Sequence, residues 1–487
     1  MFNLRDNVLT RNYTAQLFGS SILLTLSSAN FAFDNQGFSQ TQAMDPFMRR
    51  FGDLDPSGKY TLPATFLSYS NAFPFILLVF GIGFGSILSS RYGRRMTVFV
   101  MSVWAICCVP VMITSKSRSQ FLTARCLNSV YIGMDLAVIP VFQAGIVPAA
   151  VRGLAVASYQ MAFAFGVFII SGICHRTSEI PNDWAWRAPL LCYLFVPFVV
   201  GGLIWFQPES PRWLVTRGRI DGARSALSKF RKSGHDVEHE LEQVVLAVEL
   251  EKNANTESYL ACFKGRDLRR TLIVFAVNFF LQSTGQAFTS LYGALIIKSL
   301  GTINTFNYTL INNGLTAFMY LICGIPGMLP FIIAGLGTAG EATMAINTAL
   351  VTFIILFSLG FCIGWAPLSY LISAEVPSQT LRDETTRMGF AVGIVMQFVV
   401  AFSLPYLLYA PYANLGMKVG FIFAPIATLA TIWAYFFLPE LRASLIAAAW
   451  SKSTFSSRKE FRRQSPIAGA RPIDSGLSPP ILSDIEI

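Results

Sequence analysis

The chain carries little charge for its length. Asp, Glu, Lys and Arg make up 13% of its 487 residues, whereas hydrophobic residues make up 53% and phenylalanine alone occurs 42 times. A soluble domain carries about 25% charged residues. The shortage of charge excludes an ordinary water-soluble globular domain and predicts a chain that lies mostly within a membrane.

Residues that build metal and nucleotide sites are also scarce. There are three histidines, and the eight cysteines include no Cys-x-x-Cys pair, so neither a metal site nor a disulfide framework is indicated. A phosphate-binding loop of the Gly-x-x-x-x-Gly-Lys-Ser/Thr type is absent, which argues against ATP-driven pumping. We therefore expect no enzyme activity, no cofactor and no metal.

Long apolar runs dominate what is present. Reading the runs and their breaks predicts twelve membrane spans. They lie near residues 14–36, 63–87, 97–115, 120–143, 154–174, 187–207, 270–298, 305–322, 325–340, 346–371, 388–409 and 418–438. The prediction is an all-α membrane protein with two six-helix halves.

Polar segments divide the chain into four predicted parts. These are an N-terminal half (1–207), a polar linker (208–269), a C-terminal half (270–440) and a tail (441–487). Within the linker, Arg217 to Lys232 and His235 to Lys252 mix both signs of charge and are expected to form amphipathic helices on the membrane surface. The tail is rich in Ser, Pro and Arg, which predicts disorder.

Two short motifs occur twice at one spacing. Pro208-Glu209 and Pro439-Glu440 each follow an apolar run and lie 439 − 208 = 231 residues apart. Val-Pro at 147–148 and again at 376–377 repeats with nearly the same offset. Duplicated halves in a membrane chain are typical of secondary transporters, whose substrate site lies between the halves.

Basic residues set the expected orientation. Basic residues at 91–95, at 152 and in the tail fall on one side of a twelve-span chain. The positive-inside rule makes that side cytoplasmic, and both termini then lie in the cytoplasm. Much of the net charge of +10 sits there, so it does not indicate nucleic acid. We expect a multi-pass protein of the plasma membrane. Asn307, in Asn-Tyr-Thr, would face outside as a glycosylation site, unless it lies too close to the membrane.

Four motifs now support a resemblance. Residues 208–214 read Pro-Glu-Ser-Pro-Arg-Trp-Leu, residues 439–445 read Pro-Glu-Leu-Arg-Ala-Ser-Leu, residues 33–37 read Phe-Asp-Asn-Gln-Gly, and residues 91–95 read Arg-Tyr-Gly-Arg-Arg. These resemble signatures of the sugar porter family of the major facilitator superfamily, in particular a fungal member. The resemblance implies a monomeric secondary active transporter in the lipid bilayer, with proton-coupled uptake of a sugar or polyol by alternating access.

An acid lies inside the first predicted span. An ionised carboxylate within a membrane is expensive unless it is paired, so Asp34 is a functional candidate. By the resemblance, Asp34 carries the coupled proton and Arg125 in the fourth span is its counter-charge. The alternative is that Asp34 is a hydrated helix cap at the outer end of its span.

Candidates for sugar binding are buried amides and aromatic residues. Gln160 and Gln282 match hydroxyl-binding positions of the resembled family. Gln286 lies one helical turn after Gln282 and is expected to share its helical face. Tyr370 matches a sugar-contacting position, and Trp365 lies nearby. The alternatives are hydrogen bonding between helices for the amides and plain packing for the aromatic residues.

Charged residues at the inner ends of the helices form a predicted cytoplasmic gate. In the resembled family, basic loop residues pair with acids on neighbouring helices; binding to lipid headgroups is the alternative. The predicted gate residues are Arg91, Arg94, Arg95, Arg152, Glu209, Arg212, Glu375 and Arg382.

Several positions depart from the family pattern. Ser90 and Gly145 replace family acids, and Leu281 and Ala287 replace family amides. Residues 304–340 must hold two helices in 37 residues, so either both are short or a segment is missing from the sequence. Two further functions therefore stay open: a carrier for another small metabolite, such as export of a secondary metabolite, and a degenerate, non-transporting paralogue or sensor.

Overall fold

A computed structural model describes residues 14–437. Outside the described residues are 56–57, 149–151, 233–235, 254–258, 301–303, 320–343, 364, 366–368, 370–371, 374–375, 378–380 and 410. The chain forms two compact units, residues 1–431 and 432–487, and the described part of the second is the end of one helix, Ile432–Phe437. The predicted span 325–340, the tail and the second Pro-Glu pair lie outside the described residues.

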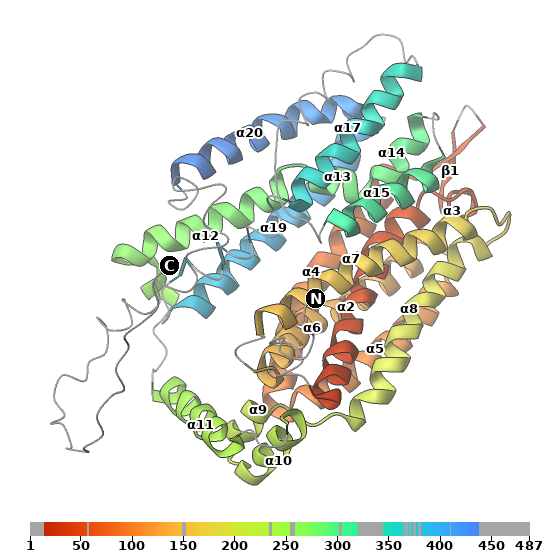
Figure 1. Cartoon of the computed structure of the whole chain (residues 1–487). Coiled ribbons are helices and arrows are strands. Elements are labelled where there is room, and N and C mark those ends of the chain that lie inside the picture. Colours follow the sequence, from red (N-terminus) through yellow and green to blue (C-terminus); the bar gives the residue numbers. More distant parts are fainter. Residues whose placement is uncertain are drawn as a thin grey trace, which may run out of the picture. The chain divides into compact units, whose positions relative to one another are not determined.

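Six long helices form the first half, where six spans were predicted (Figure 1). They are α2 (Ala15–Thr41), α4 (Ala64–Tyr92), α5 (Arg94–Ile113), α6 (Arg118–Ile146), α7 (Arg152–Thr177) and α8 (Trp184–Leu203). Between α2 and α4 lie a short helix, α3 (Asp45–Phe51), and a hairpin of β1 (Asp53–Leu54) and β2 (Tyr60–Thr61). The two strands are antiparallel, with Asp53 opposite Thr61.

The linker contains the two predicted amphipathic helices. After η2 (Ile204–Phe206) and α9 (Pro211–Thr216) come α10 (Ile220–Phe230), α11 (Val237–Asn253) and η3 (Tyr259–Phe263). Helices α10 and α11 lie where the two helices were predicted, while their place on the membrane surface stays a prediction. Apolar residues of α9, α10 and α11 make a small core of their own that includes Trp213, Leu227 and Leu241.

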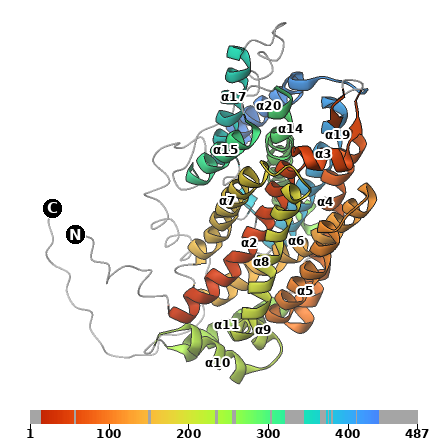
Figure 2. The ribbon, with the colours of Figure 1, turned by 90° about the vertical axis from the view of Figure 1, so that its right-hand side faces the viewer.

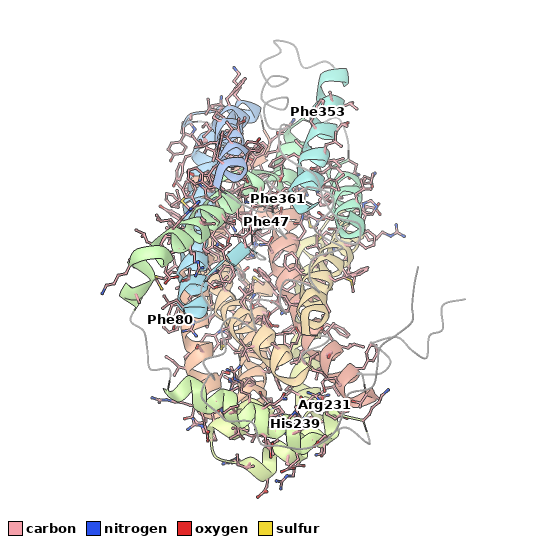
Figure 3. All side chains as sticks on the ribbon, turned by 60° about the vertical axis from the view of Figure 1, so that its left-hand side comes forward. Phe47, Phe80, Arg231, His239, Phe353 and Phe361 are labelled. Atoms are coloured by element: carbon pink, nitrogen blue, oxygen red, sulfur yellow. The ribbon has the colours of Figure 1, made fainter. Side chains whose placement is uncertain are left out.

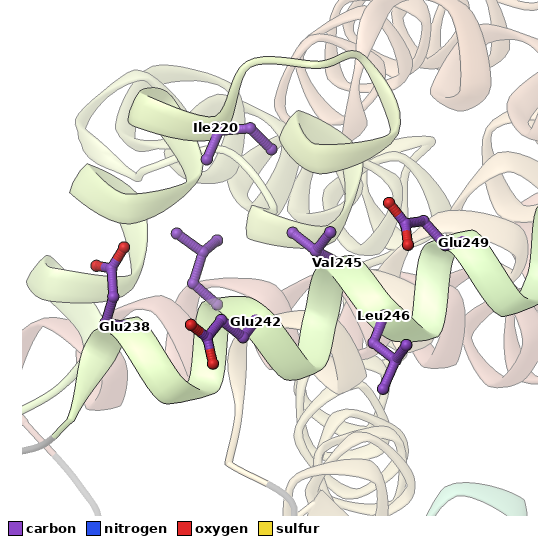
Figure 4. A pocket seen from close by; sticks show the side chains of 7 residues that line it. Ile220, Glu238, Glu242, Val245, Leu246 and Glu249 are labelled. Carbon is purple, nitrogen blue, oxygen red and sulfur yellow. The ribbon is translucent and has the colours of Figure 1, made fainter.

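A groove on the linker helices is lined by aliphatic and acidic side chains. Figure 4 shows Ile220 facing α11, from which Glu238, Glu242 and Glu249 project. Glu238 also pairs with Arg224, with 2.6 Å between Nη2 and Oε1. This groove is formed by the linker alone and has none of the predicted substrate residues.

Helices of the second half are shorter and more often broken. They are α12 (Gly265–Ser283), α13 (Gln286–Leu291), α14 (Gly293–Leu300), α15 (Thr305–Met319), α17 (Met344–Ile363), α19 (Arg382–Leu408), η4 (Gly416–Val419) and α20 (Gly420–Phe437). The repeat is visible here, because the equivalent residues Arg152 and Arg382 begin α7 and α19.

The predicted span 270–298 is present but interrupted, and Asp267–Leu291 is long and apolar enough to cross a membrane. Helix α12 ends at Ser283, and Gly285 adopts a left-handed conformation with φ of 94° before α13 begins. Glycine has no Cβ, so it takes this conformation without the steric cost that other residues meet. A second interruption at Tyr292 separates α13 from α14. The seventh span is therefore three helical pieces.

Seven of the described helices are long and apolar enough to cross a membrane. Their outward faces are apolar, as in α4, where Phe80 is 63% exposed while Phe47 of α3 is fully buried (Figure 3). Helix α2 has 27 residues but is rich in buried Ser, Asn and Gln. The helix is long enough to span a membrane. Because its polar groups face other helices rather than lipid, it does not need a strongly apolar sequence.

Helices α4 and α6 approach each other so closely that their backbones touch. A Cβ atom added to Gly133 of α6 would overlap the carbonyl oxygen of Leu78, and one added to Gly81 of α4 would overlap that of Val130. Small residues allow this kind of close packing between membrane helices, where dispersion rather than hydrophobic burial drives association.

Substitution of Gly133 should separate these two helices. We expect Gly133→Val to destabilise the purified protein by about 1–3 kcal/mol, because the branched side chain has no room against Leu78. Thermal unfolding in detergent measures this loss. The matched control is Gly83→Val on α4, where an added Cβ meets nothing within 4 Å. Equal melting temperatures for the two variants would contradict the close-contact interpretation.

Candidate functional site

The predicted pair of Asp34 and Arg125 is present between α2 and α6. Both residues are buried, 5% and 4% exposed, and Arg125 Nη1 lies 3.5 Å from Asp34 Oδ1. Asn128 Nδ2 donates to the same carboxylate oxygen at 3.1 Å. Asp34 lies seven residues before the end of α2, so the alternative of a hydrated helix cap is wrong.

Arg125 has supports that do not depend on Asp34. Its Nε donates to the carbonyl oxygen of Ser70 on α4 at 2.9 Å, and its guanidinium carbon lies 3.7 Å from the centre of the Phe38 ring. A strong charge-assisted hydrogen bond measures about 2.7–2.9 Å, so the 3.5 Å contact to Asp34 is loose. The arginine can therefore stay in place when the carboxylate becomes neutral.

The predicted sugar-binding amides are only partly brought together. Gln282 is partly buried in the last turn of α12, and Gln286 is the first residue of α13, where its Oε1 accepts from Thr289 Oγ1 at 3.5 Å. The expectation that both share one helical face is wrong, because Gly285 breaks the helix between them. Gln160 lies on α7, but its side chain is outside the described ones, and Tyr370 is outside the described residues.

Buried polar atoms without partners gather at the break after α12. Among the described residues, Ser283 Oγ, Thr284 Oγ1 and Trp365 Nε1 are buried and lack a hydrogen bond. Trp365 packs edge-on against Phe280 of α12, with ring centres 6.3 Å apart. Unsatisfied buried groups are rare and call for an explanation, and a bound polar ligand is one that fits.

Glu209 hydrogen-bonds a helix terminus, and of the predicted arginine side chains Arg94 acts on it through its charge. Its carboxylate accepts the backbone N–H groups of Arg94 at 3.0 Å and of Arg95 at 3.1 Å, at the N-terminus of α5. A third N–H comes from Ser210 at 2.9 Å. A helix N-terminus offers free N–H groups and a positive dipole end, so it suits a carboxylate.

Burial nevertheless raises the pKa of the Glu209 carboxyl above its ordinary value. The cost of removing the charge from water outweighs the three N–H groups and the nearby Arg94, which lower the pKa. The Arg95 side chain instead donates from Nη1 to the Gln207 carbonyl oxygen at 3.1 Å and lies over the Trp205 ring.

Two residues of the linker cap the end of α4. Trp213 Nε1 donates to the carbonyl oxygen of Ser90 at 3.0 Å, and Arg217 Nη2 donates to those of Ser90 and Arg91 at 2.9 Å. These bonds satisfy carbonyl groups that a helix end leaves free. Sequence reasoning missed both roles, although Trp213 lies inside a recognised motif.

The remaining predicted gate residues are placed only in part. Arg91 is exposed, and Arg212 lies near enough to Arg94 for the two guanidinium groups to repel each other. The side chains of Arg152 and Arg382 are outside the described ones, and Glu375 is outside the described residues.

Several hydrogen bonds between the two halves lie at the C-terminal end of α2, and sequence reasoning also missed them. Lys298 Nζ of α14 lies 2.6 Å from Asp45 Oδ1 and from the Ala43 carbonyl oxygen. Gln42 Nε2 donates to the Leu291 carbonyl oxygen at 2.6 Å, and Ser39 Oγ to that of Ser290 at 2.7 Å. We call this set the α2-end contact.

A buried hydrogen-bond network extends the α2-end contact to α7, which packs against α2, and to α15, which packs against α7 (Figure 2). Gln40 Nε2 and Asn313 Nδ2 both donate to Ser171 Oγ, at 2.8 and 2.7 Å. Thr309 Oγ1 donates to Gln40 Oε1 at 3.2 Å, while Asn307, two residues earlier in the first turn of α15, is exposed.

Known proteins resemble this chain over most of its length. It is 25% identical over 461 residues to the low-affinity glucose transporter HXT3 of Saccharomyces cerevisiae, covering 86% of this chain and 79% of that protein. It is 25% identical to the galactose transporter of the same yeast, covering 85% and 76%. It is 27% identical to the major facilitator-type transporter ecdD of Aspergillus rugulosus, covering 85% and 82%.

Solved structures share the fold. The xylose transporter XylE from E. coli in its partially occluded inward-open conformation superposes with a TM-score of 0.67 at 18% identity, covering 88% of this chain and 98% of that one. Its inward-open conformation gives 0.68, also at 18% identity, covering 87% and 96%. The fold is therefore that of the major facilitator superfamily. The family described as "Sugar (and other) transporter" matches residues 20–328 and 314–447. The chain, a multi-pass membrane protein, belongs to that transporter family.

Proposed function

We propose that this protein is a proton-coupled symporter that takes up a sugar or polyol by alternating access. The observation that carries the proposal is the buried, loosely joined pair of Asp34 and Arg125. Family membership and the relatives named as glucose and galactose transporters support a sugar-like substrate. A structural neighbour is described as a proton:xylose symporter, which supports proton coupling.

Coupling follows from the electrostatics of the pair. Ionised Asp34 is attracted to Arg125 and ties α2 to α6, whereas protonated Asp34 loses that attraction. Arg125 stays bound to Ser70 on α4, so α2 becomes free to move relative to α4 and α6. Proton binding thereby changes which helix arrangement is favoured, as coupled transport requires.

The substrate site in this proposal lies around the break between α12 and α13. Gln282 supplies an amide, Ser283 and Thr284 supply hydroxyls, and Trp365 supplies an indole N–H and an aromatic face. Sugar hydroxyls need several such partners in a mostly apolar cavity. Gln160, Gln286 and Tyr370 remain predicted members of the site.

The proposed orientation places the linker and both termini in the cytoplasm of a plasma-membrane protein. The α2-end contact then closes the extracellular side, and Glu209 with α5 belongs to the cytoplasmic gate. We further propose a monomer, with Asn307 as a glycosylation site on the outside.

Neutralising the coupling acid should separate exchange from accumulation. In proteoliposomes with an inward proton gradient, Asp34→Asn should abolish uphill uptake of labelled D-glucose, D-galactose or D-xylose, whichever the wild type accumulates. Exchange at equal concentrations should persist, because the neutral residue mimics the protonated acid. Asp53→Asn, in the exposed hairpin, is the control and should accumulate normally. If Asp34→Asn accumulates sugar as the wild type does, the proposed coupling is wrong.

Removing the amide of Gln282 should weaken sugar binding. A hydrogen bond is worth about 1 kcal/mol, so Gln282→Ala should raise the half-saturating sugar concentration about fivefold with little change in protein stability. Concentration-dependent exchange measures this, and Gln243→Ala on the exposed face of α11 is the control. If the two variants have the same affinity, Gln282 does not contact the substrate.

Replacing Glu209 should change how stability depends on pH. Its pKa is higher in the folded protein than the ordinary 4.5, so the folded state binds this proton more tightly. Stability from this group is present at low pH and is lost as the pH rises from 4.5 through the folded pKa. We expect Glu209→Gln to lose that decline, as measured by thermal unfolding at several pH values. Parallel curves for wild type and variant would contradict this account.

A further inference from the structure

A second acid lies deep in the first half. Asp135 of α6 is fully buried, and its carboxylate contacts hydroxyl groups: Ser27 Oγ of α2 donates to Oδ1, and the Tyr159 hydroxyl of α7 donates to Oδ2 at 2.8 Å. No lysine, arginine or histidine that the structure describes forms an ion pair with it. A buried carboxylate without a cation is expensive, which calls for a reason.

Asp135 lies on the same helix contact as the coupling pair. Ser27 and Asp34 are seven residues apart, so they share one face of α2, and Arg125, Asn128 and Asp135 share one side of α6. Seven residues of helix span about 10 Å. We call this polar contact the α2–α6 seam.

Groups between the two acids connect them. The Tyr131 hydroxyl of α6 lies between the helices, 3.3 Å from Ser27 Oγ of α2. Tyr131 and Tyr159 are the titratable groups facing Asp135, and Arg125 and Asp34 are the charged groups of the seam.

The α2–α6 seam has more acceptors than donors. Besides the two carboxylates, the amide oxygens Asn30 Oδ1 and Asn128 Oδ1 are buried and have no donor among the described residues. The one cation described in the seam, Arg125, already donates to Ser70 and contacts Asp34. An extra proton is therefore stabilised in this environment, whereas an extra anion is not.

We propose that Asp135 is a second proton-binding carboxyl of the transport cycle, on the same α2–α6 seam as Asp34. This rests on the proposed function of proton-coupled symport. When ionised, Asp135 needs the hydroxyls of Ser27 and Tyr159 as donors, which joins α2, α6 and α7. When protonated, it donates its own proton, so one of those hydroxyls must accept that hydrogen bond and direct its own proton elsewhere. Its proton thus controls packing among three helices.

The number of protons moved per sugar tests this role. Purified full-length protein in proteoliposomes is loaded with a pH-sensitive dye, and labelled D-glucose, D-galactose or D-xylose uptake is measured in parallel. We expect Asp135→Asn to move fewer protons per sugar than the wild type and to lose one step of the pH profile of exchange. Asp135→Glu should restore both, and Asp183→Asn, on the surface near Arg187, should leave both unchanged.

Two milder variants keep the carboxyl and test the same role if Asp135→Asn does not fold. Ser27→Ala and Tyr159→Phe each remove a donor that favours the ionised form. Each should move the pH midpoint of exchange upward, because the acid then holds its proton to higher pH. A purely structural role would lower stability without moving this midpoint.

The outcomes separate this role from the proposed function. Wild-type protein that transports sugar without proton movement would overturn the proposed symport and the role of Asp135 together. If the wild type is proton-coupled and Asp135→Asn has the same proton-to-sugar ratio and pH profile, only the role of Asp135 is overturned. Sugar uptake that depends on sodium rather than on the pH gradient would also overturn the role of Asp135.

Discussion

The arrangement of the first half depends on one electrostatic constraint: a carboxylate and a guanidinium lie between α2 and α6, away from water. Burying such charges is expensive, and their mutual attraction repays the cost only with further hydrogen bonds. Ser70, Asn128 and the Phe38 ring supply those supports from three helices. The other polar side chains of α2 bind partners on neighbouring helices, as Ser27 binds Asp135 and Gln40 binds Ser171, which explains why α2 is less apolar than its neighbours.

A second constraint is that backbone groups within a membrane must find partners. The loops and the linker supply them at helix ends, where Glu209 binds the start of α5 and Trp213 with Arg217 binds the end of α4. The break after α12 differs from these helix ends, because the buried hydroxyls of Ser283 and Thr284 have no hydrogen-bond partner there among the described residues. That contrast distinguishes a structural helix end from a candidate binding site.

Apolar runs and motifs predicted the six helices of the first half, the linker helices α10 and α11, and the pairing of Asp34 with Arg125. The break at Gly285 could not be predicted, because an isolated glycine is tolerated within many helices. Charge patterns suggested arginine partners for Glu209, yet its hydrogen-bond partners are backbone N–H groups that no side-chain pattern reveals. Asp135 could have been noticed, because it shares a side of α6 with Arg125 and Asn128.

The backbone contact between α4 and α6 has a mechanical consequence. Gly81 and Gly133 bring the two helices together, and Arg125 bridges them through the Ser70 carbonyl oxygen. In the proposed cycle, α4 and α6 therefore move together. Asp34 and Ser27 lie on α2, across from these two helices. We expect protonation to change how α2 is attached to this pair of helices, rather than how α4 and α6 pack against each other.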